Sequence, residues 1–275
     1  MSVAELNIPT GRPTGRPGGR PAAMDSQTVS SAELMAVRAR NEGLVAGPLL
    51  ESMIKKEFPG QIAVVSSFGA ESAVLLHMVA EIDPTVPVIF LNTGKLFGET
   101  LRYRDRLQDK LGLTDIRAIG PLPADLAAKD PNGVLWNQDA DGCCFVRKVL
   151  PLERALAPFR ASITGRKRFQ TSTRTSMHPI EEELSRVVPG LTQIAKTRFK
   201  INPLSYWGEE ELNGYLGEHR LPKHPLVKDG YRSIGCMPCT DRVPEGGSYR
   251  DGRWAGKDKD ECGIHVSTNM DGDGI

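Results

Sequence analysis

Residues 61–72 read QIAVVSSFGAES. Apolar residues at positions 62–65 follow one another without alternation, which is typical of a parallel strand that is buried on both faces. Two serines and a glycine then interrupt the apolar run, and a largely apolar helical pattern begins after residue 72. The sequence therefore predicts a strand, a polar loop and a helix, and the rest of the chain extends this unit.

The polar loop forms the N-terminus of the predicted helix. The first N–H groups of a helix lack backbone partners, and the helix dipole makes this end positive. Hydroxyls of Ser66, Ser67 and Ser72 and the flexible Gly69 surround it, so we expect a phosphate or a sulfate there. The loop has neither a dinucleotide fingerprint nor the Gly-Lys-Ser/Thr of a Walker loop. A serine-capped turn without a ligand is an equal alternative for the loop by itself.

Strand-like and helix-like segments alternate beyond this unit. Strands are expected at 86–91, 115–119, 161–164 and 197–202, and helices at 100–111, 146–156 and 209–215, after one or two opening helices. This alternation predicts an α/β fold with a doubly wound, mostly parallel sheet. Ligands of such sheets bind beyond the carboxyl ends of the strands, where the polar turns at 66–67, 92–94 and 165–166 all lie. We expect these turns to converge on one crevice.

Composition excludes several classes of protein. The 275 residues are 39% hydrophobic, which is enough for one large domain or two small ones. A formal net charge of +1 gives no reason to expect a nucleic-acid or membrane partner. No apolar run reaches the roughly 18 residues of a membrane span, and no signal peptide is recognisable. We expect a globular cytoplasmic protein.

Both ends of the chain differ from the α/β pattern. Residues 1–28 contain repeated Gly-Arg-Pro steps and little that can pack, which predicts a disordered leader. From about residue 220 the sequence is rich in proline, glycine and charge. The expected organisation is the leader, an α/β domain over 29–240 and a mobile C-terminal tail over 241–275, with a hinge at 246–248.

Four of the five cysteines form two pairs, Cys143-Cys144 and Cys236-x-x-Cys239. Two thiol pairs are a usual ligand set of zinc sites and of iron–sulfur clusters. Adjacent cysteines suit the spread irons of a cubane better than a single tetrahedral ion, which favours a [4Fe–4S] cluster. Zinc and metal-free redox thiols stay open, because Cys-x-x-Cys occurs in all three kinds of site.

Several other residues are candidates for catalysis or anion binding. Lys148 lies four residues after Cys144, so a helix would place its ammonium on the thiolate side, beside a cluster or a substrate anion. A solvated helix charge is the alternative. Cys262 is the unpaired thiol, between Glu261 and His265 in a segment whose glycines imply mobility, and an idle exposed cysteine is its alternative.

A basic run follows the strand expected at 161–164, and further arginines lie at positions 174, 250 and 253. Their planar guanidinium groups suit oxyanions. Runs of basic residues usually lie on the solvated surface, but the position of this run at the end of a strand favours anion binding.

Six motifs of this chain together resemble the assimilatory adenylyl-sulfate reductases, over about residues 61–265. The ordered Cys-Cys, Cys-x-x-Cys and Glu-Cys-Gly-x-His motifs resemble the iron–sulfur branch more than the cluster-free 3′-phosphoadenylyl-sulfate reductases. The motifs are residues 66–72, LNTGKLF at 91–97, Cys143-Cys144 with Arg147-Lys148, SIGCMPCT at 233–240, RDGRW at 250–254 and ECGIH at 261–265.

The resemblance implies an adenine nucleotide α-hydrolase-like fold, a [4Fe–4S] cluster on the four paired cysteines, and catalysis by Cys262 with Lys148 and His265. The chain departs from the family pattern at Ser162, where a tryptophan is usual, and at Phe169, where an acidic residue is usual, and this bears on the roles of residues 166–174. The implied substrate contacts are Ser66, Ser67, Phe68, Gly69, Ser72, Thr93, Gly94, Arg166, Arg168, Arg174, Arg250 and Arg253.

The implied reaction serves sulfate assimilation and cysteine biosynthesis. The Cys262 thiolate attacks the sulfur of adenylyl sulfate, AMP leaves, and thioredoxin releases sulfite from the resulting S-sulfocysteine. Use of 3′-phosphoadenylyl sulfate, alone or as a second substrate, stays open, as does a homo-oligomeric state. An ATP pyrophosphatase-type adenylating enzyme is a further alternative, although Cys262 would have no task in it. A zinc-stabilised binding module would explain only the four paired cysteines.

Overall fold

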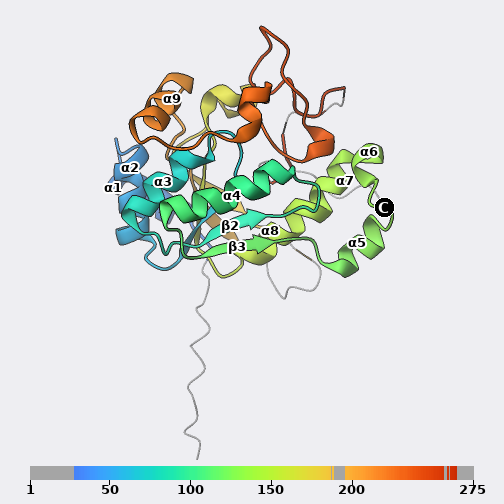
Figure 1. Cartoon of the computed structure of the whole chain (residues 1–275). Coiled ribbons are helices and arrows are strands. Elements are labelled where there is room, and N and C mark those ends of the chain that lie inside the picture. The colour runs from blue at the N-terminus through green and yellow to red at the C-terminus, as the bar shows by residue number, and fades with distance from the viewer. Residues whose placement is uncertain (1–27, 187, 189–195, 257–258, 260, 265–275) are drawn as a thin grey trace, which may run out of the picture.

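A six-stranded sheet forms the centre of the molecule (Figure 1). The computed structural model describes residues 28–186, 188, 196–256, 259 and 261–264. All neighbouring strands are parallel except β5, which runs antiparallel to β6. This confirms the predicted doubly wound, mostly parallel sheet. The strands, in their order across the sheet, are β3 (Ile116–Ile119), β2 (Val88–Leu91), β1 (Ile62–Ser66), β4 (Ala161–Thr164), β6 (Thr197–Ile201) and β5 (Ile180–Leu184).

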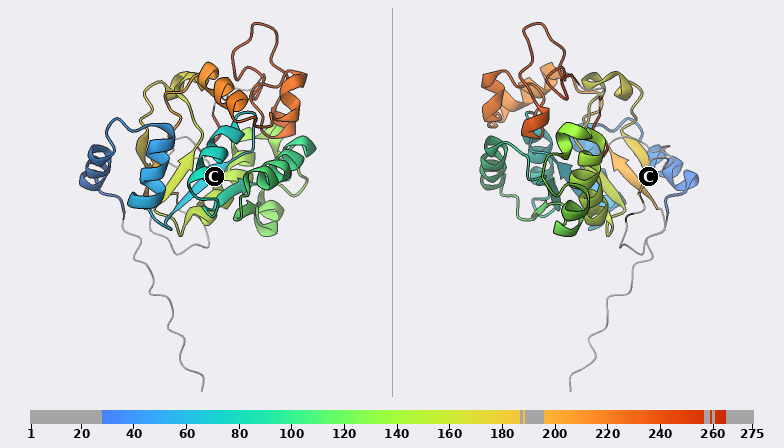
Figure 2. Two further views of the ribbon diagram at one scale, coloured as in Figure 1. Left: turned by 60° about the vertical axis from the view of Figure 1, so that its left-hand side comes forward. Right: turned by 90° about the vertical axis from the view of Figure 1, so that its right-hand side faces the viewer.

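Helices lie on both sides of the strands (Figure 2). Val64 and Phe90 pack into the larger core with residues of α3 and α4, whereas Ala63 and Ile89 pack against α8 on the other side. Because successive residues of β1 and β2 are buried on opposite faces, the apolar runs show no alternation. The helices are α1 (Ser31–Arg40), α2 (Ala46–Ser52), α3 (Ser72–Ile82), α4 (Gly98–Leu111), α5 (Pro123–Lys129), α6 (Leu135–Gln138), α7 (Ala140–Cys144), α8 (Leu150–Leu156) and α9 (Glu209–Glu218).

Several elements differ from the sequence prediction, among them the short helices α5 and α6, which were not expected. Strand β5 was not expected, because its sequence IEEEL is mostly acidic. Its acidic side chains find buried cations, since Glu183 pairs with Lys200 and Arg198 of β6. The helix expected over 146–156 begins earlier: α7 passes through a π-helical segment, Phe145–Val149, into α8. Cys143 and Cys144 therefore lie inside this helical stretch.

The strand order reverses between β1 and β4, which pair directly, so that Val65 is the partner of Thr164. Such a switch point opens a crevice at the carboxyl ends of the two strands. Residues 220–256 gather at one end of the molecule, drawn in orange to red in Figures 1 and 2. Of the expected leader only Thr28 is described, and of the expected tail 241–256, 259 and 261–264. Within the described chain, no helix is long and apolar enough to cross a membrane.

Candidate active site

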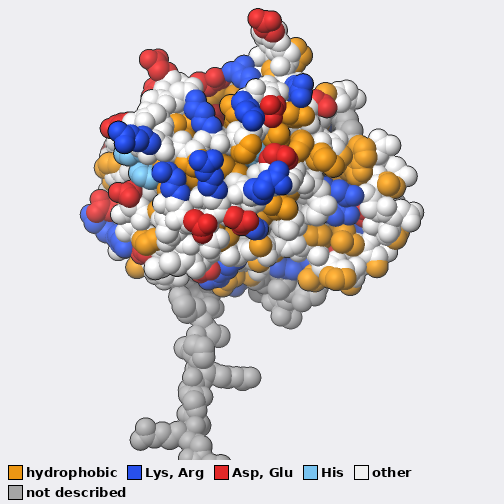
Figure 3. Space-filling model, in the orientation of Figure 1, with side chains coloured by type: hydrophobic (Ala, Val, Ile, Leu, Met, Phe, Trp, Pro, Cys, Tyr) orange, Lys and Arg blue, Asp and Glu red, His pale blue; other side chains and the backbone are white. Residues whose placement is uncertain are grey.

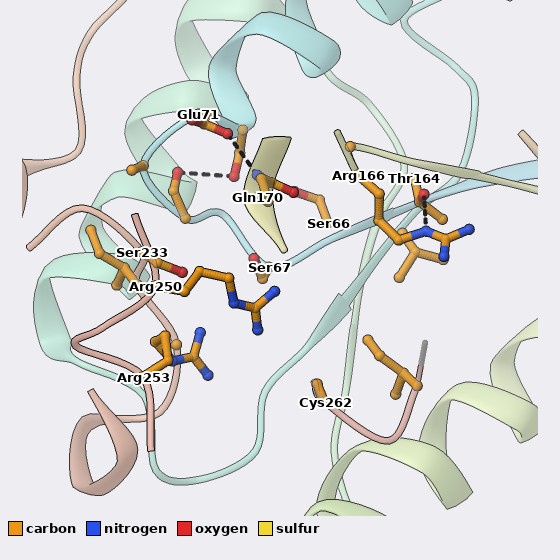
Figure 4. Close-up of a pocket in the computed structure, with 18 of the residues that line it drawn as sticks. Ser66, Ser67, Glu71, Thr164, Arg166, Gln170, Ser233, Arg250, Arg253 and Cys262 are labelled. Carbon is orange, nitrogen blue, oxygen red and sulfur yellow. Dashed lines mark hydrogen bonds between the residues drawn. The ribbon is translucent and has the colours of Figure 1, made fainter. Parts of the chain in front are cut away.

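A cavity of about 210 Å³ lies at this switch point (Figure 4). The polar turns after three strands reach it: Ser66 and Ser67 follow β1, Thr93 follows β2, and Arg166 follows β4. The predicted convergence of these turns on one crevice is confirmed. Cys262 also lines the cavity, from a segment almost 200 residues beyond the loop after β1.

The loop after β1 turns its serines to the cavity and its aromatic side chain to the core. Phe68 is fully buried with an edge-on contact to Phe90, and its φ of +49° is strained for a bulky residue. Ser66 accepts a hydrogen bond from the Phe68 N–H, whereas Ser72 donates to the Gly69 carbonyl. No side chain caps α3, so the serine-capped alternative does not describe this turn. The N–H groups of Ser72 and Val74 instead donate to the Gly69 and Glu71 carbonyls, so the first turn of α3 is closed by backbone hydrogen bonds.

Positive charge surrounds the cavity. Neither Lys148 nor Arg253 forms an ion pair with a described carboxylate, and the buried Nε of Arg250 has no partner. Burial lowers the pKa of Arg250 to about 10, so this guanidinium remains a cation at neutral pH. The six basic side chains that line the cavity are Lys148, Arg166, Lys167, Arg174, Arg250 and Arg253.

Three of these cations are held closely by acidic residues, and Arg250 has a longer contact to Glu261 at 3.4 Å. Arg166 donates to Glu181 at 2.6 Å, and in Figure 4 its guanidinium points toward Thr164 rather than toward Arg250. Arg174 forms a bidentate pair with Glu261, at 2.6 and 2.8 Å. Lys167 is paired with Glu71. Unpaired positive charge is therefore concentrated at the end of the cavity that carries Cys262.

Three expected contacts do not line this cavity. The Arg168 guanidinium lies 4.2 Å from the centre of the Tyr206 ring, and its Nε donates to the Met177 carbonyl. Phe68 is a core residue, because the turn after β1 directs its ring inward. Gly94 follows Thr93 with a φ of +70°, a left-handed conformation that favours glycine, but it does not itself line the cavity. The expected catalytic His265 lies outside the described residues.

Cys262 is buried against Cys144, with a hydrogen bond between the two thiols. This hydrogen bond holds the pKa of Cys262 well below its usual range; burial opposes the shift, and the Lys148 ammonium adds to it. The pKa of Cys144 is raised correspondingly by the same hydrogen bond and by burial. Burial by itself would lower the pKa of Lys148, but the thiols of Cys262 and Cys236 raise it. The net shift of the Lys148 pKa is upward. The arrangement therefore favours a Cys262 thiolate beside a lysine cation.

The four paired cysteines line a second, much smaller cavity of about 10 Å³. Lys148 borders both cavities and so lies between these thiols and the larger space. The Thr93 hydroxyl lies 3.2 Å from the Cys236 sulfur, and the indole N–H of Trp254 is buried without a hydrogen-bond partner among the described residues. All five cysteines are free thiols. Among the described residues, no three His, Cys, Asp or Glu side chains form a group that could hold a metal ion.

Arg147 has a structural position. It forms a buried pair with Asp130 at 2.6 Å and donates to the Thr93 carbonyl at 2.8 Å, so it ties the cysteine helix to the turn after β2.

Sequence reasoning missed two further parts of the site. One is the Glu71–Lys167 pair, to which Gln170 adds a 3.0 Å hydrogen bond. The other is Gly235, against which the Arg253 guanidinium packs so closely that an added Cβ would lie only 2.4 Å from it and would displace this side chain. The sequence indicates a role for Gly235 only through its position directly before the Cys-x-x-Cys motif.

Comparison with known proteins gives consistent matches. Residues 61–242 match the family described as "Phosphoadenosine phosphosulfate reductase domain". The "Adenosine 5'-phosphosulfate reductase" of Mesorhizobium japonicum is 52% identical over 219 residues, which cover 80% of this chain and 82% of the relative. A protein of the same name from a Chelativorans species is 43% identical over 246 residues, 89% of this chain and 96% of the relative.

A solved structure supports the fold. The phosphoadenylyl-sulfate reductase from Candida auris, crystallised as a phosphate complex, superimposes with a TM-score of 0.61 at 24% identity. The alignment covers 78% of this chain and 98% of that structure. The family match covers the loop after β1, all six strands and the Cys-x-x-Cys motif, so the chain belongs to the phosphoadenosine phosphosulfate reductase family.

Proposed function

We propose that this protein reduces adenylyl sulfate to sulfite and AMP in assimilatory sulfate reduction. The relatives that match over most of the chain carry the name of this activity. One observation carries the proposal: Cys262 lies in the same cavity as the polar loop before α3 and the cations Lys148, Arg250 and Arg253. A nucleophile beside a site for anions suits an attack on an anhydride of phosphate and sulfate.

The first chemical step forms a covalent intermediate. The Cys262 thiolate attacks the sulfate sulfur, the bond from sulfur to the bridging oxygen breaks, and AMP leaves with the electron pair. Negative charge develops on the phosphate as this bond breaks, and the cations of Arg250, Arg253 and Lys148 would stabilise it. Cys262 then carries an S-sulfonate. The thiolate is the required form, and the Lys148 ammonium beside Cys262 would stabilise it.

The second step requires a dithiol reductant, which we propose is thioredoxin. One reductant thiolate attacks the Cys262 sulfur, sulfite leaves, and the second thiol closes the reductant's disulfide and frees Cys262. Cys262 is buried as described, so a bulky protein reaches it only after its segment moves. This supports a tail that closes for the first step and opens for the second.

We infer further that Cys143, Cys144, Cys236 and Cys239 hold a [4Fe–4S] cluster. Their thiols come from two distant segments and line one buried cavity, as a four-thiolate ligand set should. The unpartnered indole N–H of Trp254 borders the same cavity, which suits a sulfur-rich acceptor. When bound, the cluster would supply negative charge next to Lys148 and so help to fix that cation toward the substrate.

Turnover assays test the function directly. We expect the anaerobically purified protein to form sulfite from adenylyl sulfate when thioredoxin and its reductase are supplied. Absence of sulfite from both adenylyl sulfate and its 3′-phosphorylated form would contradict the proposal. Release of pyrophosphate from ATP would instead favour an adenylating enzyme. Iron and acid-labile sulfide, at about four each per chain, would support the cluster, whereas stoichiometric zinc without sulfide would exclude it.

A further inference from the structure

The wall of the cavity opposite Cys262 is formed by an acidic side chain. Figure 4 shows Glu71 on the far side of the cavity, with Ser67 and Arg250 between it and Cys262. Glu71 immediately precedes α3, so the loop after β1 fixes its position. Its carboxylate is therefore a permanent part of the site, placed at the end away from the reacting sulfur.

Glu71 neutralises the cation nearest to it. Its Oε2 accepts hydrogen bonds from the Lys167 ammonium and, at 3.0 Å, from the Gln170 amide, and the Tyr249 hydroxyl also bonds to the carboxylate. The side chain of Lys167 is 3% exposed and that of Glu71 is 14% exposed. A pair this far removed from water is held together firmly, so Lys167 is not free to bind a ligand anion.

The position of the nucleophile sets the direction of the substrate. The sulfate sulfur must lie at Cys262, and the adjoining phosphate then lies among the unpaired cations at that end. The nucleoside extends from the phosphate toward the opposite wall, which brings the ribose hydroxyls toward Glu71. A carboxylate accepts hydrogen bonds from ribose hydroxyls and repels a phosphate in the same place, as acidic residues do in dinucleotide sites.

We propose that Glu71 determines substrate specificity by excluding nucleotides that carry a 3′-phosphate. This inference rests on the proposed function. A 3′-phosphate adds up to two negative charges at neutral pH. It would meet the Glu71 carboxylate and a Lys167 that is already neutralised, whereas a 3′-hydroxyl can donate to the carboxylate. Selectivity for adenylyl sulfate then comes from a repulsive group as much as from attractive contacts.

The experiment compares kcat/KM for adenylyl sulfate and for 3′-phosphoadenylyl sulfate in the wild type and in Glu71→Gln. The glutamine amide has nearly the shape of the carboxylate and still forms hydrogen bonds, but it carries no negative charge. It therefore does not repel a 3′-phosphate, and it leaves the Lys167 ammonium without a charged partner. We expect the preference for adenylyl sulfate to fall by at least about tenfold, mostly through better use of the phosphorylated substrate. An unchanged preference in a folded Glu71→Gln enzyme overturns the assignment.

Glu181→Gln is the matched control. It also removes a carboxylate from a cavity-lining cation, Arg166, but this guanidinium points toward Thr164, away from the expected ribose position. The substrate preference of this variant should stay as in the wild type. An equal shift in both variants would mean that net charge alone sets the preference, and the role of Glu71 would be refuted.

Binding to the wild type gives a readout that needs no variant. Calorimetry should show AMP binding at least about tenfold more tightly than adenosine 3′,5′-bisphosphate, and equal affinities would overturn the role of Glu71. The two proposals fail differently. No sulfite from adenylyl sulfate refutes the function, whereas robust turnover with no discrimination against the 3′-phosphate refutes the role of Glu71 alone.

Discussion

Cys262 is the residue on which the proposed chemistry depends, and its covalent intermediate can be isolated. In the wild type, adenylyl sulfate without thioredoxin should release one AMP per chain in a burst and add one SO₃ group, because the second step is blocked. Cys262→Ser should show neither change while it still binds AMP. Intact-mass analysis with peptide mapping measures the adduct. Modification of another cysteine, or AMP release only after thioredoxin is added, would contradict the role of Cys262.

Lys148 should matter for catalysis more than for folding. Its ammonium borders both cavities and has no described carboxylate partner, so its charge acts on the thiols and on a bound anion. We expect Lys148→Ala to lower kcat/KM by about 10²-fold, the usual effect of losing one group that stabilises developing charge. Lys55→Ala is the control, because Lys55 is an exposed residue paired with Asp83. Equal effects of the two substitutions would leave Lys148 an ordinary helix charge.

The positions of single residues at strand ends could be predicted from the sequence. The positions of residues that contact a partner far away in the chain could not. A serine that follows a buried strand must lie at the sheet edge, so the sequence alone indicates that Ser66 belongs to the site. Arg168 follows a strand by only four residues, but the stacking partner that draws it away, Tyr206, is 38 residues distant. Its place is decided by a tertiary contact that no local pattern encodes.

At the scale of elements, Glu261 anchors the tail segment that carries Cys262, and an ion pair between Lys259 and Asp141 adds to the attachment. Glu261 forms the bidentate pair with Arg174, a further contact to Arg250 at 3.4 Å and one to the Thr171 hydroxyl at 3.3 Å. Both members of the main pair are largely buried. Because the next residue is Cys262, this anchor sets where the thiol lies.

Loss of this anchor should expose the thiol. Glu261→Gln leaves Arg174 without a charged partner, so we expect iodoacetamide to alkylate Cys262 several-fold faster than in the wild type. Peptide mapping at timed intervals measures the rate at this cysteine. Glu245→Gln, a change at an exposed residue of the same tail, should leave the rate unchanged. An alkylation rate that stays at the wild-type value in Glu261→Gln would show that the segment is held by other contacts.

The sequence predicted the strands that are buried along their whole length. It did not predict the strand whose charged side chains are buried. The residues of β1 and β4 are buried almost throughout, and their bounds follow closely from the sequence. Strand β5 has three consecutive glutamates, of which Glu183 pairs with Arg198 and Lys200 of the partner strand and Glu181 pairs with Arg166. A strand stabilised by cross-strand ion pairs has no apolar pattern for sequence reasoning to detect.

At the scale of the whole molecule, the catalytic end and the outer surface differ in charge. On the face seen in Figure 3, basic and acidic side chains are interspersed. Surface ion pairs such as Arg102–Glu99 and Arg117–Asp115 neutralise charge locally. Unpaired positive charge instead lines the internal cavity. The formal net charge of +1 therefore conceals a local concentration of cations at the place where a substrate anion would bind.

His224 connects the stability of the molecule to pH. It lies between α4 and the segment that leads to Cys236, and it is almost fully buried. Its Nδ1 accepts a hydrogen bond from the Leu226 N–H, and its Nε2 lies 3.0 Å from the Thr100 hydroxyl. A protonated ring could not accept the bond from Leu226. Burial lowers the pKa of His224 to about 4, a shift that Glu99 opposes only in part.

This shift predicts an acid-sensitive fold. Between about pH 6.5 and pH 4 the unfolded chain binds a proton at His224 and the native state does not, so the free energy of unfolding falls as the pH falls. Above the unfolded pKa the His224 contribution is constant, and its full loss amounts to at most about 3 kcal/mol. Urea unfolding at pH 7.5 and pH 5 measures it. His224→Gln should be less stable at pH 7.5 but lose less on acidification, because glutamine does not titrate. The same loss in variant and wild type would assign the acid sensitivity to other groups, such as His77 and His178, whose pKa values burial also lowers.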